Sequence, residues 1–262
     1  MSEPATPHMD ISNFDPRSAP IGPDELRNRV ILITGASQGI GRAVAVSCAQ
    51  HGATVLLLGR NVRQLNQVHA QISTEYGAER TAIVEFDLEN ALARDYDALY
   101  SAIEERYQRL DGLLHNAGLL GQLAPVEHYD VPTWCRVLQV NLTAAFVLTQ
   151  VLLPLLKRAA DASIVFTSSS VGRVGRAYWG AYAVSKFALE GLNEVSSEEL
   201  SGITRIRVNS LNPGATRTAM RRQAYPAEDA DLLATPQSIT RPYIALLGPA
   251  SHGISGGRFE AQ

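Results

Sequence analysis

The residues in this sequence best suited to acid/base chemistry are Tyr182 and Lys186, which stand four positions apart. On a helix this spacing places both side chains on one face. A phenol has a pKa of about 10, so lowering it to near neutrality requires on the order of 4 kcal/mol of preferential stabilisation of the phenolate. We expect the Lys186 ammonium, in a partly desolvated cleft, to supply much of it. Without supporting motifs, the same spacing is typical of two exposed side chains.

A glycine-rich turn follows the first apolar run. The segment TGASQGIG spans residues 34–41 and leads into a helical pattern that begins at Gly39. Glycines permit a tight strand-to-helix turn and a close approach of a pyrophosphate, which the free N–H groups of the helix start also favour. Many such turns serve geometry only, but a position after the first strand favours dinucleotide binding. The predicted contacts from this turn are Gly35, Ser37, Gln38, Gly39, Ile40 and Gly41.

The end of the second apolar run indicates which dinucleotide is bound. An acidic residue that would hydrogen-bond the ribose of NAD is missing there, because Gly59 takes its place and Arg60 follows. A guanidinium can bind a 2′-phosphate bidentately, whereas a carboxylate would repel it. The sequence therefore favours NADP(H) over NAD(H), with Arg42 as a second candidate for the phosphate. The alternative is that Arg60 is a solvated loop residue.

The elements that must position these residues alternate along the chain. Apolar runs predict strands at Val30–Ile33, Thr54–Leu58, Ala82–Phe86, Gly112–His115, Ser163–Thr167 and Ile206–Leu211, and Gly253–Glu260 could supply a last one. Helical periodicity predicts helices at Gly39–His51, Val62–Tyr76, Ala91–Arg109, Pro132–Lys157 and Tyr182–Leu200. Runs that are apolar throughout, joined by long crossovers, predict a parallel sheet covered on both faces. We therefore expect a single α/β domain with a Rossmann-type, doubly wound parallel sheet, which binds ligands beyond the carboxyl ends of its strands.

Composition narrows the class of protein. A chain of 262 residues with 45% hydrophobic residues can bury the core of one domain. The net charge of −3 and pI of about 6.1 give no basic footprint for a nucleic acid. Cys48 and Cys135 have no paired-cysteine spacing, and no His/Cys cluster has metal-ligand spacing, so we expect free thiols, no metal and a cytoplasmic protein.

Two segments could be mistaken for targeting or membrane elements. Residues 1–25 are rich in proline and acids, without the apolar core of a signal peptide, and predict an irregular arm before a domain at 26–262. Val137–Leu156 contains no charged residue and is long enough to span a bilayer. Polar residues and Pro154 interrupt it, so we interpret it as a buried helix and expect no membrane partner.

From Arg29 to the C-terminus the sequence resembles the classical short-chain dehydrogenase/reductases. TGASQGIG matches the family's cofactor motif, HNAG at 115–118 is similar to its NNAG motif, YAVSK at 182–186 matches Tyr-x-x-x-Lys, and NPGATRT at 212–218 is similar to its PG motif. The motifs occur in the family's order and spacing. His115 replaces the usual first asparagine, which puts the outer part of that motif in doubt. Within the family the sequence is most similar to the YciK-like bacterial reductases.

The resemblance implies a role for each matching position. The implied catalytic residues are Asn141, Ser169, Tyr182 and Lys186, with Ser169 chosen over Ser168 and Ser170 because it lies thirteen residues before Tyr182. Asn141 would hold a proton-relay water, Ser169 would orient the substrate oxygen, and Lys186 would also bind the nicotinamide ribose. The implied cofactor contacts, besides those of the glycine turn and Arg60, are Asp87, Leu88, Asn116, Ala117, Gly118, Tyr182, Lys186, Pro213, Gly214 and Thr218.

The expected function is hydride transfer between NADP(H) and a small carbonyl or alcohol substrate. The two alternatives are an NAD-dependent alcohol dehydrogenase and a non-catalytic NADPH-sensing regulator, against which the intact catalytic set argues. The resemblance also implies a substrate lid near residues 219–236 and a homodimer or homotetramer assembled through the long apolar helices. Trp179, Arg173 and Arg176 could contact substrate, or could equally be core or solvated. Arg221 and Arg222 could contact substrate or cofactor phosphates, but a solvated face is favoured for them.

Overall fold

The computed structural model describes residues 11–262, and in these residues one sheet has seven strands in the order β3-β2-β1-β4-β5-β6-β7. Every neighbouring pair is parallel. The strands are β1 Val30–Thr34, β2 Thr54–Gly59, β3 Thr81–Glu85, β4 Gly112–His115, β5 Ala162–Thr167, β6 Ile206–Asn212 and β7 Arg258–Glu260. The strand order reverses between β1 and β4, which is the switch point of a doubly wound sheet. The predicted Rossmann-type architecture is confirmed.

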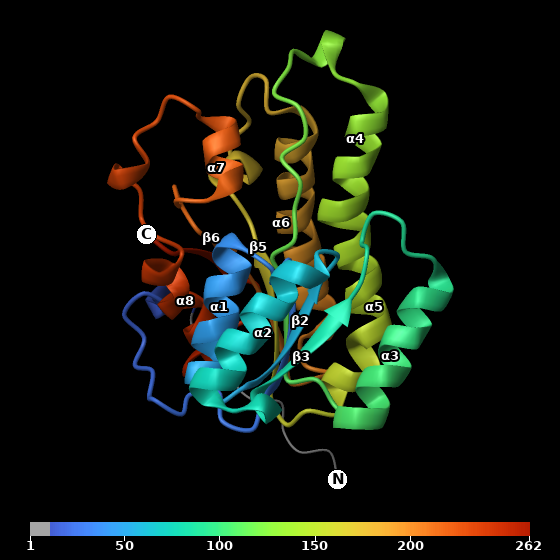
Figure 1. Cartoon of the computed structure of the whole chain (residues 1–262), viewed down its shortest axis with the longest axis vertical. Helices are drawn as coiled ribbons and strands as arrows, with labels where there is room; N and C mark the ends of the chain where they lie inside the picture. The colour runs from blue at the N-terminus through green and yellow to red at the C-terminus, as the bar shows by residue number, and fades with distance from the viewer. Residues whose placement is uncertain (1–10) are drawn as a thin grey trace.

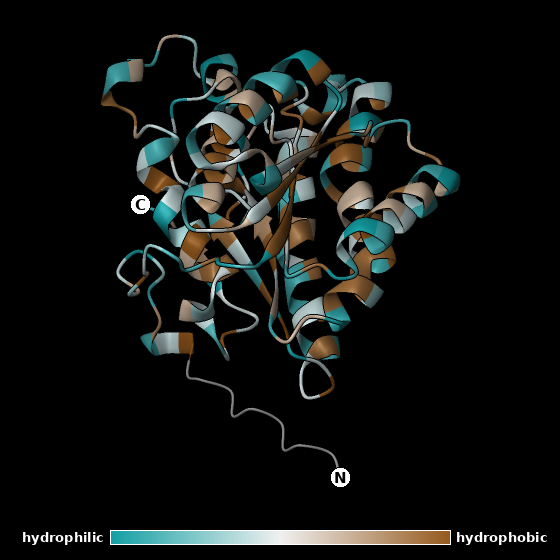
Figure 2. Cartoon of the chain, turned by 60° about the horizontal axis from the view of Figure 1, so that its bottom comes forward, coloured by the Kyte–Doolittle hydropathy of each residue, from teal (hydrophilic) through white to brown (hydrophobic). Residues whose placement is uncertain are grey.

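Helices cover both faces of the sheet (Figure 1). They are α1 Gly39–Gln50, α2 Val62–Tyr76, α3 Ala93–Tyr107, α4 Val131–Leu138, α5 Ala144–Lys157, α6 Gly180–Leu200, α7 Ala219–Ala224 and α8 Thr240–Leu247. One apolar cluster joins the sheet to α3, α5 and α6, and a second joins it to α1, α2 and α8. Figure 2 shows the strands as hydrophobic between helices whose outer surfaces are largely hydrophilic. The apolar strand sequences are thus explained by burial from both sides.

Two predicted elements differ from the structure. Only Arg258–Glu260 of the predicted segment Gly253–Glu260 forms a strand, because Gly253 and Gly256 have φ of 78° and 82° and make turns. The predicted helix Pro132–Lys157 is divided by a π-helical turn at Gln139–Thr143. Such turns insert an extra residue and often occur at functional sites. Asn141 lies in this one.

The stretch Val131–Lys157 is long and apolar enough to cross a membrane by length and composition alone. In the fold it packs against the sheet and α3, and Leu148, Leu152 and Leu155 are completely buried there. Packing in the protein core therefore accounts for the apolar residues on this side of the helix.

The segment before β1 packs against the end of the chain. The Phe14 ring makes an edge contact with Phe259, with centroids 5.5 Å apart, and the Arg17 guanidinium donates to the backbone oxygen of Gln262. Leu26 is completely buried. Residues 1–10 of the predicted arm lie outside the described residues, and its boundary at 25 stays a prediction.

The turn between β1 and α1 is packed tightly onto β4. Thr34 Oγ1 accepts the backbone N–H groups of Asn116 and Ala117 at 2.9 and 3.0 Å, and the Asn116 side-chain amide donates to the Thr34 oxygen. Gly35 has a φ of 66°, and a Cβ there would lie 2.9 Å from the Ala117 Cα. A Cβ on Gly41 would lie only 2.3 Å from the Gly35 oxygen. Gly41 therefore allows α1 to approach the turn.

We expect Gly41→Ala to lower the free energy of unfolding by about 1–3 kcal/mol, because the added methyl group must displace buried backbone. Urea denaturation followed by circular dichroism measures the change. Gly191→Ala is the matched control, since a Cβ there would meet nothing within 4 Å and alanine favours a helix by up to about 1 kcal/mol. Equal stability of the two variants would contradict this account of Gly41.

Candidate functional site

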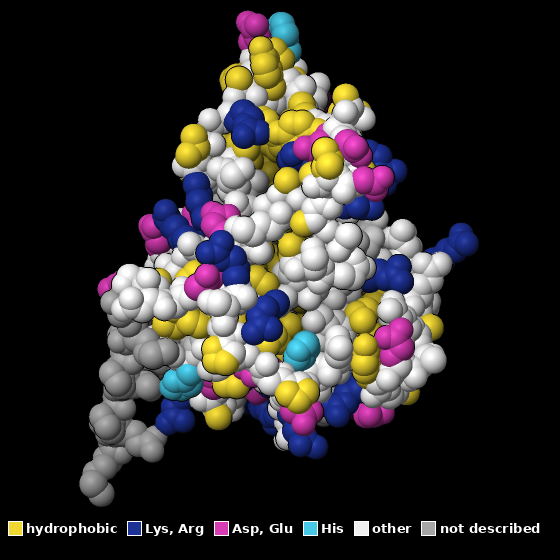
Figure 3. All heavy atoms as spheres, turned by 90° about the vertical axis from the view of Figure 1, so that its left-hand side faces the viewer, with side chains coloured by type: hydrophobic (Ala, Val, Ile, Leu, Met, Phe, Trp, Pro, Cys, Tyr) yellow, Lys and Arg dark blue, Asp and Glu magenta, His cyan; other side chains and the backbone are white. Residues whose placement is uncertain are grey.

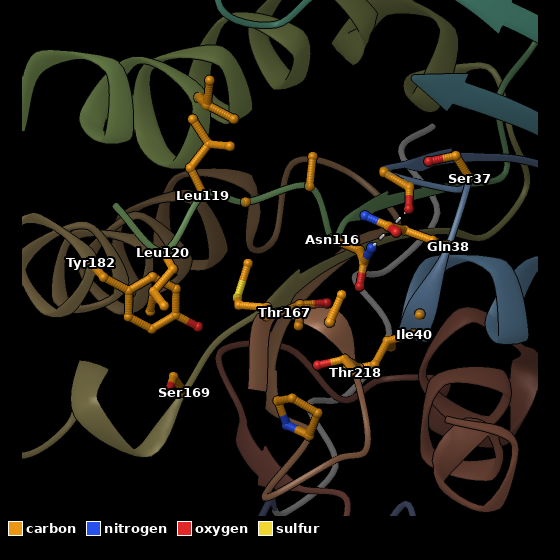
Figure 4. Close-up of a pocket in the computed structure, with 18 of the residues that line it drawn as sticks. Ser37, Gln38, Ile40, Asn116, Leu119, Leu120, Thr167, Ser169, Tyr182 and Thr218 are labelled. Atoms are coloured by element: carbon orange, nitrogen blue, oxygen red, sulfur yellow. Dashed lines mark hydrogen bonds between the residues drawn. The ribbon is translucent and has the colours of Figure 1, made fainter. Parts of the chain in front are cut away.

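A cleft of about 470 Å³ lies at the carboxyl ends of the strands. It brings together nearly all of the predicted site residues, from seven separate parts of the chain. Those that line it are Gly35, Ser37, Gln38, Gly39, Ile40, Arg60, Asp87, Leu88, Asn116, Ala117, Gly118, Ser169, Tyr182, Lys186, Pro213, Gly214 and Thr218. Figure 4 shows Tyr182 and Ser169 toward one end of the cleft and Ser37 and Gln38 toward the other.

Two predicted residues do not line this cleft. Gly41 is buried beneath the glycine turn, so its part is to let α1 pack closely rather than to contact a ligand. Asn141 is also buried, and its side chain is occupied by protein partners. Asn141 Oδ1 accepts from Leu119 N at 2.7 Å, and its Nδ2 donates to the Leu119 oxygen and to Ser185 Oγ. The side chain therefore holds the backbone beyond β4 against α6.

Tyr182 lies in the first turn of α6 and is 9% exposed. Burial raises the pKa of its phenol to about 12, and a hydrogen bond with Ser169 opposes that shift. From the Tyr182–Lys186 spacing in the sequence, Lys186 was expected to lower this pKa toward neutrality. In the chain by itself this does not happen, because the cost of burying the phenolate outweighs the interactions that favour it. Without a ligand the phenol is therefore protonated.

Lys186 follows Tyr182 on the same face of α6 and is 3% exposed. Its ammonium lies 5.6 Å from the centre of the Tyr182 ring and donates to the backbone oxygen of Thr167 at 2.7 Å. Burial lowers the pKa of Lys186 to about 8, and the Glu190 carboxylate opposes that shift. An ammonium has three N–H donors, so others remain for a ligand.

The three consecutive serines after β5 have different surroundings. Ser168 is buried and its hydroxyl donates to the Glu190 carboxylate, while Ser170 is exposed at the start of a short 3₁₀ turn. Ser169 lies between them and lines the cleft near Tyr182. Its placement agrees with the role expected for it, which itself stays a prediction.

The opposite end of the cleft suits a dinucleotide. Gln38 precedes α1, and its side chain does not cap the helix, so the first backbone N–H groups are available to an anion. Arg60 is 58% exposed and its guanidinium lies 3.2 Å from Glu89, which Arg136 also binds at 2.8 Å. Arg42 does not line the cleft and donates instead to Gln71.

His115, the departure from the family motif, is a core residue. It is 4% exposed, its ring stacks on Phe166 with centroids 4.9 Å apart, and its Nε2 is 2.9 Å from Thr149 Oγ1. Burial lowers the pKa of His115 to about 3, so the ring is neutral. It joins β4 to α5 behind the cleft, and Asn116 keeps its place in the motif.

The five residues that could contact substrate fall into two groups in the structure. Trp179 and Arg221 line the cleft, whereas Arg173, Arg176 and Arg222 do not. Arg173 binds the carboxylates of Glu190 and Glu260 behind it.

Several residues that line the cleft were not predicted from the sequence. Thr167 and Asn212 are the last residues of β5 and β6, so the rule that ligands lie beyond the carboxyl ends of strands could have found them. Glu89 gave no local signal, because its relation to Arg60 arises only when β2 and β3 pair.

Residues 11–262, which the structure describes, contain no group of three or more His, Cys, Asp or Glu side chains that could bind a metal ion.

Figure 3 shows acidic and basic side chains interspersed on the face at the left of Figure 1.

Comparisons with known proteins show the family to which the chain belongs. Residues 29–229 match the family model described as short chain dehydrogenase. The chain is 49% identical over 239 residues to the uncharacterized oxidoreductase YciK of Escherichia coli K12, covering 91% of this chain and 94% of that one. A short chain dehydrogenase from Shigella flexneri crystallised with NADP is 48% identical, with a TM-score of 0.89, and the match covers 92% of this chain and 100% of that one. One from Escherichia coli CFT073 crystallised with NADPH is 50% identical, also with a TM-score of 0.89, over 92% and 99% of the two chains. The chain is therefore an oxidoreductase of the short-chain dehydrogenase family.

Proposed function

We propose that this protein is an NADP(H)-dependent reductase that converts a ketone or aldehyde to its alcohol, with Tyr182 as the general acid/base. The observation that carries the proposal is the convergence of Tyr182, Ser169 and Lys186 with the glycine turn in one cleft. A protein that only sensed the dinucleotide would not need a buried proton donor beside the binding site.

The cleft offers N–H donors to the anionic parts of the cofactor at the start of α1 and at Arg60, which must exchange its single contact with Glu89 for the 2′-phosphate. The N-terminus of α1 and the glycine turn would hold the pyrophosphate, Asp87 and Leu88 would contact the adenine, and Arg60 would meet the 2′-phosphate. The related Shigella and E. coli proteins crystallised with NADP and NADPH support the choice of the phosphorylated cofactor. When bound, the dinucleotide supplies the hydride that adds to the carbonyl carbon.

The proton comes from this chain's own residues. The Tyr182 phenol, which burial keeps protonated, donates to the carbonyl oxygen as that oxygen gains negative charge. Ser169 donates a hydrogen bond to the same oxygen and orients it. Lys186, held by the Thr167 oxygen, stabilises the phenolate that remains. The Asn141 side chain fixes the backbone at Leu119, and the proton-relay water expected at Asn141 stays part of the proposal.

In the ligand-free site the Tyr182 phenol is protonated, which is the form that donates a proton when a carbonyl is reduced. An NAD-dependent alcohol dehydrogenase, the second candidate, would need the phenolate first. A comparison of NADPH with NADH and of ketone with alcohol distinguishes the two.

We also propose that the protein is a homodimer or homotetramer. Phe146 on α5 and Val184, Phe187 and Val195 on α6 are 47%, 45%, 43% and 55% exposed, which leaves apolar surface on both helices. A second copy would bury these side chains.

We also propose that residues 219–236 form a substrate lid and that the protein is cytoplasmic. Cys48 and Cys135 are both free thiols, which suits a reducing compartment.

Replacing Tyr182 with Phe removes the proton donor but keeps the ring. We expect turnover to fall by about 10²–10⁴-fold while NADPH affinity is retained. Absorbance loss of NADPH with a panel of aldehydes, diketones and quinones measures turnover, and fluorescence titration measures binding. Tyr178→Phe is the control, because Tyr178 is 61% exposed and does not line the cleft. Near-normal turnover of Tyr182→Phe would exclude the assignment.

Replacing Arg60 with Ala should weaken NADPH by at least about tenfold and NADH by much less, since a hydrogen-bonded charge pair contributes about 1.5–3 kcal/mol. Dissociation constants of both cofactors are measured by fluorescence titration. Arg63→Ala, an exposed arginine outside the cleft, is the control. Equal weakening of NADPH and NADH would remove Arg60 from the 2′-phosphate.

Replacing Phe146 with Asp should shift the protein toward the monomer, because a carboxylate would be buried in the contact. Light scattering during size-exclusion chromatography measures the mass. Ile203→Asp changes another exposed apolar residue, 75% exposed and outside the α5–α6 surface, and should leave the mass unchanged. A wild-type protein that is monomeric at micromolar concentration rules out the proposed assembly.

A further inference from the structure

One end of the cleft, next to Tyr182, is lined by apolar side chains. Leu120 and Tyr182 form a small cluster with Trp179, Met220 and Ala224, and all five line the cleft. Figure 4 shows Leu120 beside the Tyr182 ring. Trp179 and Met220 are only partly buried, so they present apolar surface to whatever the cleft holds. A ligand that covers this surface gains about 25 cal/mol per Å² of apolar area removed from water.

The charged groups of the cleft lie elsewhere or are already paired. Among the described residues that line it, Arg60, Asp87 and Glu89 belong to the β2–β3 end, and Lys186 donates to the Thr167 oxygen. Besides Lys186, whose ammonium lies 5.6 Å from the centre of the Tyr182 ring, only Arg221, on α7, places a charge at the apolar end within that lining.

Arg221 is not free to bind an anion. Its Nε and Nη2 atoms each donate to a carboxylate oxygen of Glu228 at 2.6 Å, in a bidentate ion pair. Its guanidinium also stacks 3.9 Å from the centre of the Tyr225 ring. Arg176 donates to the Tyr225 hydroxyl and lies 5.8 Å from the centre of the Trp179 ring, but it does not line the cleft. An acidic substrate would have to displace Glu228 before it gained a partner.

We propose that the apolar end accepts an uncharged, largely apolar ketone or aldehyde, and that Arg221 fastens α7 to Glu228 instead of binding a substrate carboxylate. The inference rests on the proposed function, because Tyr182 marks where the carbonyl oxygen lies. An unpaired carboxylate at this end would lose its hydration without gaining a counter-charge, which costs several kcal/mol. The Arg221–Glu228 ion pair thus disfavours the binding of acidic substrates, and it also holds α7 at the cleft.

A matched pair of ketones tests the charge preference. 4-Methylcyclohexanone and 4-oxocyclohexanecarboxylate have the same ring and differ in one substituent. We expect kcat/KM, from NADPH absorbance, to favour the neutral ketone by at least about 100-fold. Glu228→Ala releases Arg221 and should raise kcat/KM for the acid by about tenfold, and adding Arg221→Ala to it should remove that gain. Arg222→Ala, on the exposed side of α7, should change neither ketone.

A binding measurement separates this inference from the proposed activity. The chain has two tryptophans, so Trp134→Phe leaves Trp179 as the only fluorescent indole. With NADP⁺ present, the neutral ketone should change Trp179 fluorescence at a concentration at least about tenfold lower than the acid does. If this holds while neither ketone is reduced, the substrate class stands and the reductase assignment fails. Preference for the acid that Arg221→Ala abolishes overturns the inference, and so does the absence of both turnover and a fluorescence change.

Discussion

The site depends on the Lys186 ammonium, a charged group that is buried where the loss of its hydration costs free energy. Lys186 is 3% exposed, and burial brings its pKa down to about 8. Two groups oppose that loss of charge: the Thr167 backbone oxygen accepts an N–H, and the Glu190 carboxylate lies one helical turn further along α6. A buried cation keeps such a hydrogen bond because an unpaired charge in the protein interior is costly.

Glu190 connects the surroundings of Lys186 by hydrogen bonds to residues at the edge of the sheet. Its carboxylate accepts from the Ser168 and Ser210 hydroxyls and from Arg173, whose guanidinium also binds Glu260 in β7. The short last strand is therefore linked to the active-site helix by a continuous series of charged hydrogen bonds. Such a fully bonded polar cluster is rigid, and it explains why Arg173 stays behind the cleft although its sequence position suggested a substrate contact.

The same cost of burial sets the state of Tyr182. The phenol pKa rises to about 12 because no counter-charge within the chain outweighs the loss of water around it. The protein alone thus prepares an acid, which suits reduction of a carbonyl. In the mechanism proposed, the negative charge left on the phenol after proton transfer is stabilised by the Lys186 ammonium. The expectation from spacing alone treated the ammonium as dominant, since a sequence does not state how deeply either side chain is buried.

The sequence by itself determined the alternation of strands and helices as far as β6, the Rossmann-type sheet and the positions of the glycine turn and the Tyr-x-x-x-Lys pair, whereas α7 and α8 were not predicted. These depend on local spacing and on apolar runs that a sheet covered on both faces requires. Even so, the extra turn residue at Asn141 and the shortness of β7 were not predicted, because a π turn and a glycine loop have no distinct periodicity. Tertiary structure alone decided that Lys186 and Glu190, one helical turn apart on α6, are both buried, that Glu89 meets Arg60 and that Glu228 binds Arg221. Each of these is a charge interaction between side chains whose distance and burial exist only after the chain has folded.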